Sequence, residues 1–341
     1  GQVADEQIVA DFDNLPALRK LAEKTDVITY EFEHINTSLL KIIEIEGRDI
    51  YPSASTLELI QNKFVQKSFL KNIDVDVPKF CRVNSPDELK KAFKEFGGKL
   101  ILKTCTQGYD GKGNLVISNI NELEDAYNKF DGMEIMAEEF VNYKHEVSIL
   151  VIKNEKEIVV YPVSENIHKK SILIKSLIPA NISKNIEKII NETAVKIVNS
   201  LDDYGVFCIE FFVDSKMDIL VNEIAPRPHN SGHYTIEGCI SSQYEQLIRV
   251  ITGMPLGNSA LRMPCAMYNI LGHSYVHGEY DIYGVDEVLS IPDCHLHLYG
   301  KPRTNNLKKI GHITVLDSSV ENADKKGRVA IRKIEIRRKK V

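Results

Sequence analysis

The sequence lacks the features that would place it among membrane-spanning, secreted or nucleic-acid-binding proteins. No apolar run in its 341 residues approaches the roughly 18 that a membrane-spanning helix needs, and no signal-peptide pattern is present. Low-complexity segments and internal repeats are absent. A formal net charge of −5 gives no general attraction to nucleic acid or to an anionic membrane. We therefore expect a protein with neither nucleic acid nor a membrane as its partner.

The six cysteines also lack a pattern, because they are scattered and include no Cys-x-x-Cys pair or zinc-like spacing. Several lie in apolar segments typical of strands, so we interpret them as reduced, buried thiols of a cytoplasmic protein. With 27% charged and 43% hydrophobic residues, the composition is that of an ordinary globular protein. The length is sufficient for two or three domains with large buried cores.

A further absence concerns residues 1–62, where helix and strand patterns alternate as in a parallel sheet. The segment opens almost directly on a helix, without a first strand and glycine-rich turn. We therefore expect a parallel α/β domain that is short of its first one or two β-α units. Glu31 and Glu33 follow the short strand 26–30, at the edge where ligands of such sheets bind. The alternative is that both are solvated acids ahead of a helix.

The most informative stretch is 205–234, which is typical of two strands, a turn and a polar loop. Two apolar runs, 206–213 and 219–224, flank turn residues and predict a hairpin. Each strand carries one carboxylate in its middle, Glu210 and Glu223. Carboxylates among apolar residues are costly to bury unless they are paired or coordinated, and two side by side repel each other.

The turn length decides whether these carboxylates meet. A four-residue loop, 215–218, would set Glu210 opposite Glu223, whereas a three-residue loop, 215–217, would place Asn222 there. In the first register a divalent cation would compensate both charges, and Mg²⁺ suits one or two carboxylates completed by phosphate oxygens. The alternative is that each glutamate forms a salt bridge with Lys or Arg. The polar loop that follows, with Arg227, is predicted to face an anionic ligand.

A second glycine-rich stretch covers 99–118. A Walker loop or a dinucleotide fingerprint must open a helix, but this loop lies between two strands, so both are excluded. A flexible hairpin flap over a nucleotide remains, with Lys103 at its base. The alternative is an ordinary glycine-rich hairpin. In the preceding helix Lys63 is the candidate for a phosphate contact, whereas Lys67 and Lys71 are interpreted as solvated.

Two acids and a basic end complete the pattern. The extended run 134–141 would offer backbone groups to a base edge, with Glu138 beside it and Glu146 placed to hold a ribose.

The last 17 residues carry nine Lys or Arg against one acid. Without interleaved aromatic residues this end is interpreted as a solvated tail.

A flap, an extended hinge and paired carboxylates, in that order, resemble the ATP-grasp ligases. Four runs are similar to one family among them, the N5-carboxyaminoimidazole ribonucleotide synthetases: YEFE at 30–33, GYDGKG at 108–113, NEIAPRPHNSGH at 222–233 and HLYGK at 297–301. The resemblance covers roughly residues 1–316. It implies an α/β and α+β protein with this division: a truncated Rossmann-like pre-ATP-grasp domain (1–62), an ATP-grasp small lobe with the flap (63–141), a large lobe with the Mg²⁺ site (142–262), a small C-terminal β-rich domain (263–318) and a basic tail (319–341).

The resemblance further implies an ADP-forming carbon–nitrogen ligase of purine biosynthesis, acting as a homodimer. Bicarbonate would attack the γ-phosphate of ATP, and the resulting carboxyphosphate would carboxylate 5-aminoimidazole ribonucleotide. Mg²⁺ would be held by Glu210 and Glu223. The residues implied at ATP are Lys63, Lys103, Gly108, Gly111, Gly113, Glu138, Phe140, Val141, Glu146 and Asn222. Those implied in catalysis are Asp110 for proton transfer, with Tyr109, Lys112 and Arg227 at the reacting groups. Those implied at the ribonucleotide and bicarbonate are Glu31, Glu33, His229, Asn230, Ser231, Lys301, Lys308 and Lys309.

Two departures from the family pattern leave alternatives open. The family's usual first strand and glycine turn are not in this sequence, and the basic loop 302–309 is less arginine-rich than usual. Since lysine cannot make a bidentate arginine contact, we expect weaker phosphate binding. The alternatives are a related ATP-grasp ligase that activates another acid, such as formate or an amino acid, and a nucleotide-binding protein that is inactive without its first β-α units.

Overall fold

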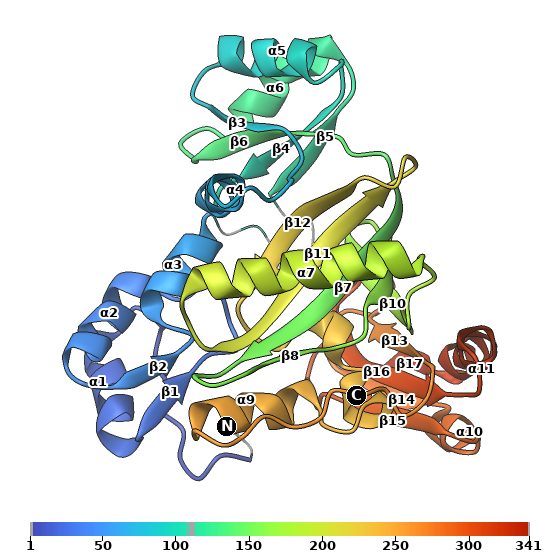
Figure 1. Cartoon of the computed structure of the whole chain (residues 1–341). Coiled ribbons are helices and arrows are strands. Elements are labelled where there is room, and N and C mark those ends of the chain that lie inside the picture. The colour runs from blue at the N-terminus through green and yellow to red at the C-terminus, as the bar shows by residue number, and fades with distance from the viewer. Residues whose placement is uncertain (1–2, 107, 109–112, 340–341) are drawn as a thin grey trace.

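The computed structural model describes residues 3–106, 108 and 113–339, and Figure 1 shows the arrangement of their elements. The first domain consists of α1 (Leu15–Lys24), β1 (Val27–Thr29), α2 (Thr37–Ile45), β2 (Asp49–Tyr51) and α3 (Ala54–Gln61). β1 and β2 pair in parallel, with Ile28 opposite Ile50. The Asn14 side chain caps α1 by accepting from the Ala17 N–H, as the sequence pattern favours. The prediction of an α/β domain is confirmed.

The small lobe is a four-stranded antiparallel sheet in the order β3-β6-β4-β5, with two helices packed on it. Its elements are α4 (Lys63–Asn72), β3 (Phe80–Val83), α5 (Pro86–Glu95), β4 (Leu100–Thr104), β5 (Asn114–Ile117), α6 (Leu123–Asn128) and β6 (Ile135–Glu139). Leu89 of α5, Leu123 of α6 and Leu102 of β4 belong to one buried cluster. In Figure 1 the sheet of this lobe stands apart from the rest together with α5 and α6, and α4 lies between.

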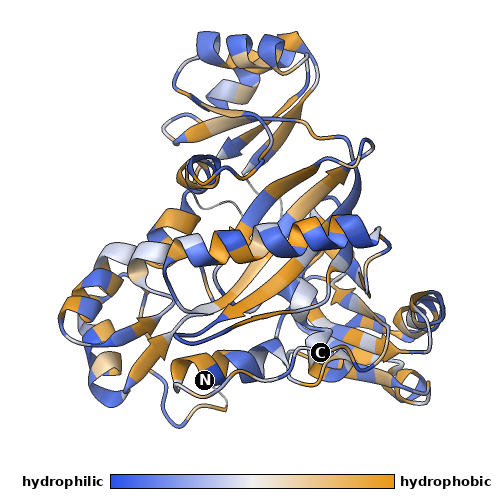
Figure 2. Ribbon diagram, viewed as in Figure 1, coloured by the Kyte–Doolittle hydropathy of each residue, from blue (hydrophilic) through white to orange (hydrophobic). Residues whose placement is uncertain are grey.

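The large lobe is built on a nine-stranded sheet in the order β12-β11-β7-β9-β10-β13-β16-β15, with β8 beside β7. Its first elements are β7 (Tyr143–Lys153), β8 (Ile158–Val160), β9 (Ser164–Lys169), β10 (Ile172–Ile178), α7 (Lys184–Leu201), β11 (Gly205–Asp214) and β12 (Ile219–Ala225). After β12 come a short 3₁₀ turn, η2 (Asn230–Gly232), then α8 (Thr235–Gly238) and α9 (Gln243–Ile251). Ile190 and Ile197 of α7 are fully buried against one face of the sheet, and Val250 of α9 packs on the other. Figure 2 shows these central strands as a hydrophobic band.

The C-terminal strands continue this sheet. The elements are β13 (Cys265–Leu271), β14 (Tyr280–Tyr283), α10 (Val285–Leu289), β15 (Cys294–Leu298), β16 (Lys309–Leu316), α11 (Val320–Lys333) and β17 (Glu335–Arg338). β13 pairs with β10, and Cys265 lies opposite Ile178. The segment predicted as a small C-terminal domain therefore shares backbone hydrogen bonds with the large lobe. None of the helices in the described ranges is long and apolar enough to cross a membrane.

The interpretation of the last 17 residues as a solvated tail is wrong for the part that the structure describes. Asp324 of α11 forms ion pairs with Lys175 of β10 and with Arg328, and it accepts from the Tyr268 hydroxyl of β13. β17 pairs with β14 and buries Ile336. The sequence hides this packing because the buried face of α11 consists of small residues, which give a weak hydrophobic signal among many charges.

Gly327 provides a test of this docking. A Cβ atom at Gly327 would lie 2.4 Å from Cε2 of the Tyr268 ring. We expect Gly327→Val to lower the free energy of unfolding by roughly 2 kcal/mol, because overpacking a tight core costs about 1–3 kcal/mol. Chemical denaturation monitored by circular dichroism measures the change. Lys325→Val, at an exposed position of the same helix, is the control and should change stability little. Equal stabilities for the two variants would contradict the docking.

Candidate active site

The hairpin of β11 and β12 sets Glu210 opposite Glu223, and this part of the prediction is confirmed. The turn, however, is the three-residue one. Val213 pairs with Ile219, and the Asp214 N–H donates to the Asp218 carbonyl (3.0 Å). A β-bulge at Asn222, between the pairs Phe211–Val221 and Glu210–Glu223, then restores the register. The Asn222 amide donates to Glu210 Oε2 (3.3 Å), so three oxygen-bearing side chains gather here.

The two carboxylates differ in how neighbouring groups compensate their negative charge. Burial disfavours the Glu223 carboxylate, but the Lys63 ammonium, with Nζ 2.5 Å from Oε1, holds the pKa of Glu223 below its usual value. Burial together with the charges of Glu146 and Glu223 raises the pKa of Glu210 to about 7. Nε2 of the His229 ring lies 3.8 Å from Glu210 Oε1. The salt-bridge alternative therefore describes Glu223, whereas burial and the neighbouring carboxylates favour the protonated form of Glu210.

Behind this pair lies a second buried cluster. Lys103 Nζ lies 2.7 Å from Glu138 Oε1, and Lys67 Nζ lies 2.8 Å from Glu138 Oε2. Burial opposes ionisation, but the two ammonium groups outweigh it and lower the pKa of Glu138 to about 2. Lys67 also donates to the Asn222 carbonyl (3.1 Å). The interpretation of Lys67 as solvated is therefore wrong, because it is 2% exposed and tethers α4 to both lobes.

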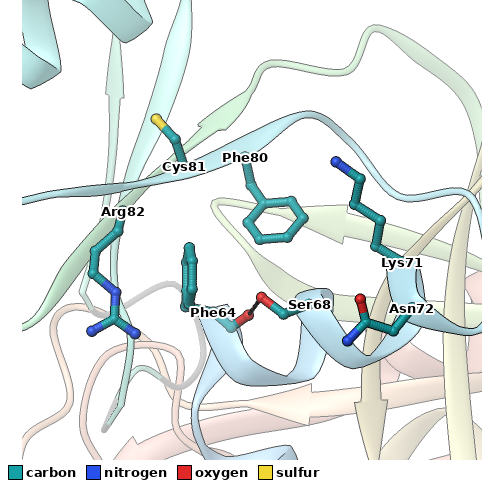
Figure 3. Close-up of a pocket in the computed structure, with 7 residues that line it drawn as sticks. All are labelled: Phe64, Ser68, Lys71, Asn72, Phe80, Cys81 and Arg82. Carbon is teal, nitrogen blue, oxygen red and sulfur yellow. Dashed lines mark hydrogen bonds between the residues drawn. The ribbon is translucent and has the colours of Figure 1, made fainter.

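Lys71, one turn further along α4, is exposed. Together with Phe64 and Ser68 it lines a surface depression of about 610 Å³ whose other wall is β3, with Phe80 and Arg82 (Figure 3). The Phe64 and Phe80 rings meet edge to face with centroids 5.4 Å apart. The helix thus directs Lys63 and Lys67 toward the carboxylates, and Lys71 away from them.

The connection between the lobes runs from β6 to β7. Phe140 and Val141 are half-buried, and the Lys99 ammonium lies 3.4 Å from the centroid of the Phe140 ring. On β7, Glu146 Oε2 lies 3.0 Å from His168 Nδ1. Burial would lower the pKa of His168, but the hydrogen bond with Glu146 raises it. His168 lies in β9 and is not among the residues that the sequence pattern predicts at the site.

The first domain reaches the same region through Glu33. Its Oε1 lies 2.9 Å from Arg227 Nε, and burial raises the pKa of this carboxyl in spite of that arginine. The charges of Glu223 and Lys63 also act on Glu33, so the first domain and the hairpin share one electrostatic cluster. Glu31 is exposed, and its charge acts on the Tyr244 hydroxyl of α9.

The loop after β12 is held rigidly. His229 donates its backbone N–H to the buried Gln243 side chain (2.8 Å) and accepts from the same amide at its carbonyl (2.9 Å). Burial, aided by Arg227 and Lys309, depresses the pKa of His229 well below its usual value. Asn230 exchanges two side-chain hydrogen bonds with Asn269 of β13, at 3.0 and 2.6 Å. Ser231 is 1% exposed.

The remaining predicted residues divide into two groups. Gly108 and Gly113 flank the flap; the Gly113 carbonyl accepts from the Thr104 N–H (2.9 Å), and a Cβ at Gly113 would collide with the Thr104 hydroxyl. Tyr109, Asp110, Gly111 and Lys112 lie outside the described residues.

The second group lies on the C-terminal strands. Lys308 donates to the Arg303 carbonyl within its own loop (2.8 Å), and the Lys301 ammonium lies 5.6 Å from the centroid of the Tyr299 ring. Lys309 begins β16, and its charge acts on His229, His168 and His233. The C-terminal strands therefore bring positive charge to the hairpin.

Comparisons with known proteins cover almost the whole chain. Residues 1–61 match the ribonucleotide synthetase preATP-grasp domain, residues 68–244 the ATP-grasp domain, and residues 265–326 the phosphoribosylaminoimidazole carboxylase C-terminal domain. The N5-carboxyaminoimidazole ribonucleotide synthase of Staphylococcus aureus (strain COL) is 39% identical over 324 residues, which are 94% of this chain and 84% of the relative. That of Bacillus subtilis (strain 168) is 39% identical over 93% of this chain and 82% of the relative.

Solved structures agree with this assignment. The N5-carboxyaminoimidazole ribonucleotide synthetase of Thermotoga maritima superposes with a TM-score of 0.90 at 42% identity, covering 99% of this chain and 89% of that one. The N5-carboxyaminoimidazole synthase of Aspergillus clavatus, in complex with ADP and 5-aminoimidazole ribonucleotide, gives 0.89 at 32% identity, covering 97% and 87%. The sequence resemblance is thereby confirmed, and the chain belongs to the N5-carboxyaminoimidazole ribonucleotide synthetase family of ATP-grasp ligases.

Proposed function

We propose that this protein carboxylates 5-aminoimidazole ribonucleotide in purine biosynthesis, with ATP and bicarbonate as co-substrates and ADP and phosphate as products. The observation that carries the proposal is the placement of Glu210 and Glu223 on paired strands, with Lys63 beside them and the Arg227–Ser231 loop directly after them. Such a site can hold a metal–nucleotide complex on one side and an anionic acceptor on the other. The Aspergillus clavatus enzyme, which has this fold, was solved in complex with ADP and 5-aminoimidazole ribonucleotide.

The side chains at the hairpin fit a hard divalent cation. Glu210 and Glu223 would hold Mg²⁺, with the Asn222 side chain beside Glu210, because Mg²⁺ prefers oxygen ligands and completes its shell with phosphate and water. The raised pKa of Glu210 indicates excess negative charge that a cation would relieve. When bound, the ion would neutralise charge on the phosphate oxygens of ATP.

The residues of the chain would position the reactants around that charge. Lys63 and Lys103 extend from α4 and β4 and would face the phosphates, held in place by Glu223 and Glu138. Because both Glu138 oxygens are engaged by lysines, the adenine edge would be met by the backbone of 139–141. Glu146 would hold the ribose.

The acceptor side would use the loop after β12 and the basic residues of the C-terminal strands. Bicarbonate would bind near Arg227 and His229 and attack the γ-phosphate, which yields carboxyphosphate; the amine of the ribonucleotide would then take the carboxyl group. Glu31, Glu33, Asn230 and Ser231 would line this region. Lys301, Lys308 and Lys309 would meet the ribonucleotide phosphate. Asp110, with Tyr109 and Lys112, stays a prediction for proton transfer, as do Gly108, Gly111 and Gly113 for ATP.

We also infer a cytoplasmic enzyme that acts as a homodimer. All six cysteines are free thiols and five are buried, which fits a reducing compartment. The homodimer follows from the family resemblance.

Replacement of one carboxylate tests the magnesium role. Loss of a residue that only supports a metal ligand typically costs 10–100-fold, so Glu223→Gln should lower Mg·ATP-dependent turnover at least about 100-fold. The fold should be retained in far-UV circular dichroism. Turnover is measured across a Mg²⁺ titration, with Glu192→Gln, on the exposed side of α7, as the matched control. Near wild-type turnover in Glu223→Gln would leave only the salt-bridge role for this residue.

The identity of the activated acid is tested by isotope transfer. If bicarbonate attacks the γ-phosphate, one oxygen of ¹⁸O-labelled bicarbonate should appear in the inorganic phosphate, because the attacking oxygen stays on phosphorus. ADP release should require bicarbonate and 5-aminoimidazole ribonucleotide together. Mass spectrometry of the phosphate and a coupled ADP assay measure both. ADP release driven by formate or an amino acid would favour the related-ligase alternative instead.

A further inference from the structure

A chain of buried polar side chains runs beneath the hairpin and ends at His229. It crosses the large sheet from β10 through β9 and β7 to η2. Ser176 Oγ donates to Asn166 Oδ1 (2.7 Å), and Asn166 Nδ2 donates to Ser148 Oγ (2.8 Å). Ser148 Oγ lies 2.8 Å from Ser231 Oγ, which in turn lies 2.8 Å from His229 Nδ1. All four residues before His229 are at most 5% exposed, so water does not compete for these bonds.

The backbone of the loop fixes which ring nitrogen of His229 carries the proton. The backbone N–H of Ser231 donates to Nδ1 (3.4 Å), so a proton on Nδ1 would point at another proton. On the far side of the ring, Nε2 lies 3.8 Å from Glu210 Oε1, beyond hydrogen-bond distance. The contact at Nδ1 therefore favours an imidazole with its proton on Nε2.

The hydroxyl chain can run in the direction that this tautomer needs. Ser148 accepts from Asn166 and has its own proton to donate to Ser231, and Ser231 can then donate to Nδ1. The Ser164 hydroxyl, also 2.8 Å from Ser148 Oγ, can donate to the Ser148 carbonyl (3.2 Å). Successive hydroxyls that each accept one bond and donate one polarise each other in a low-dielectric interior.

We propose that Ser231 and Ser148 are positioning residues that hold His229 as the neutral Nε2–H tautomer. His229 then meets the ligand as a hydrogen-bond donor and does not accept a proton from it, since its acceptor nitrogen is turned into the protein. That the ligand is an oxygen of bicarbonate or of carboxyphosphate rests on the proposed function. The tautomer itself rests only on the contacts of the ring.

The tautomer can be read directly in the full-length protein labelled with ¹⁵N-histidine. Long-range ¹H–¹⁵N correlation spectra distinguish protonated from unprotonated ring nitrogens, and the His229 signals are assigned by their loss in His229→Gln. We expect a protonated Nε2 and an unprotonated Nδ1 without any substrate present. In Ser231→Ala the ratio of the two tautomers should fall about ten-fold, as expected for the loss of one buried hydrogen bond. Ser148→Ala should lower the same ratio, and it replaces Ser231→Ala as the test if that variant does not fold.

Ser241→Ala is the matched control, because Ser241 is a buried serine whose hydroxyl donates to Glu245 and takes no part in the hydrogen-bonded series that ends at His229. It should leave the His229 signals and the turnover number unchanged. A protonated Nδ1 in the wild type, or His229 signals that are insensitive to both Ser231→Ala and Ser148→Ala, would overturn the proposal. An Nε2–H tautomer in a protein without bicarbonate-dependent turnover would instead overturn the proposed function and leave this proposal standing.

Discussion

Two glutamates on neighbouring strands place negative charge where the sheet is buried, and much of the surrounding structure compensates it. Lys63 neutralises Glu223, and the same helix brings Lys67 to Glu138, where Lys103 completes a buried triad. Buried charges persist only when they are paired in this way. Glu210 Oε1 lies 3.8 Å from Nε2 of the His229 ring, beyond hydrogen-bond distance. The asymmetry between the two carboxylates is therefore the physical reason to expect a cation at the hairpin.

The same charges connect the three parts of the molecule. Glu33 of the first domain forms an ion pair with Arg227, and Lys67 of α4 donates to the Asn222 carbonyl of the hairpin. The charge of Lys309, on the C-terminal strands, acts on His229. A site assembled from four segments of sequence depends on the fold for its geometry. This explains why single motifs, such as the glycine-rich loop, indicate the function only weakly, whereas their order along the chain identifies the family.

Sequence reasoning found the elements whose signal is local, and it failed where packing decides. The apolar runs of β11 and β12 predict the hairpin, but its turn is one residue shorter than the predicted register requires, and the compensating bulge at Asn222 leaves no mark in the hydrophobic pattern. Lys67 has the composition of a surface residue, and only the approach of β6 shows that it is buried. The docked face of α11 is built of small residues, so its charges dominated the interpretation. The sequence likewise gives no indication that the Ser148 and Ser231 hydroxyls form hydrogen bonds with each other, because a serine in a strand or loop has no distinguishing spacing.

The continuity of the large sheet also bears on how the chain folds during synthesis. The edge of β10 exposes unpaired backbone groups until β13 pairs with it. The outer edge of β13 is in turn unpaired until β16 is added. Between the emergence of Ile178 and that of Cys265, the ribosome must produce α7, the β11–β12 hairpin and α9 while that edge stays open. The catalytic half of the lobe is thus made before the strands that seal it, and an open edge in a partly made sheet is a site for misassembly.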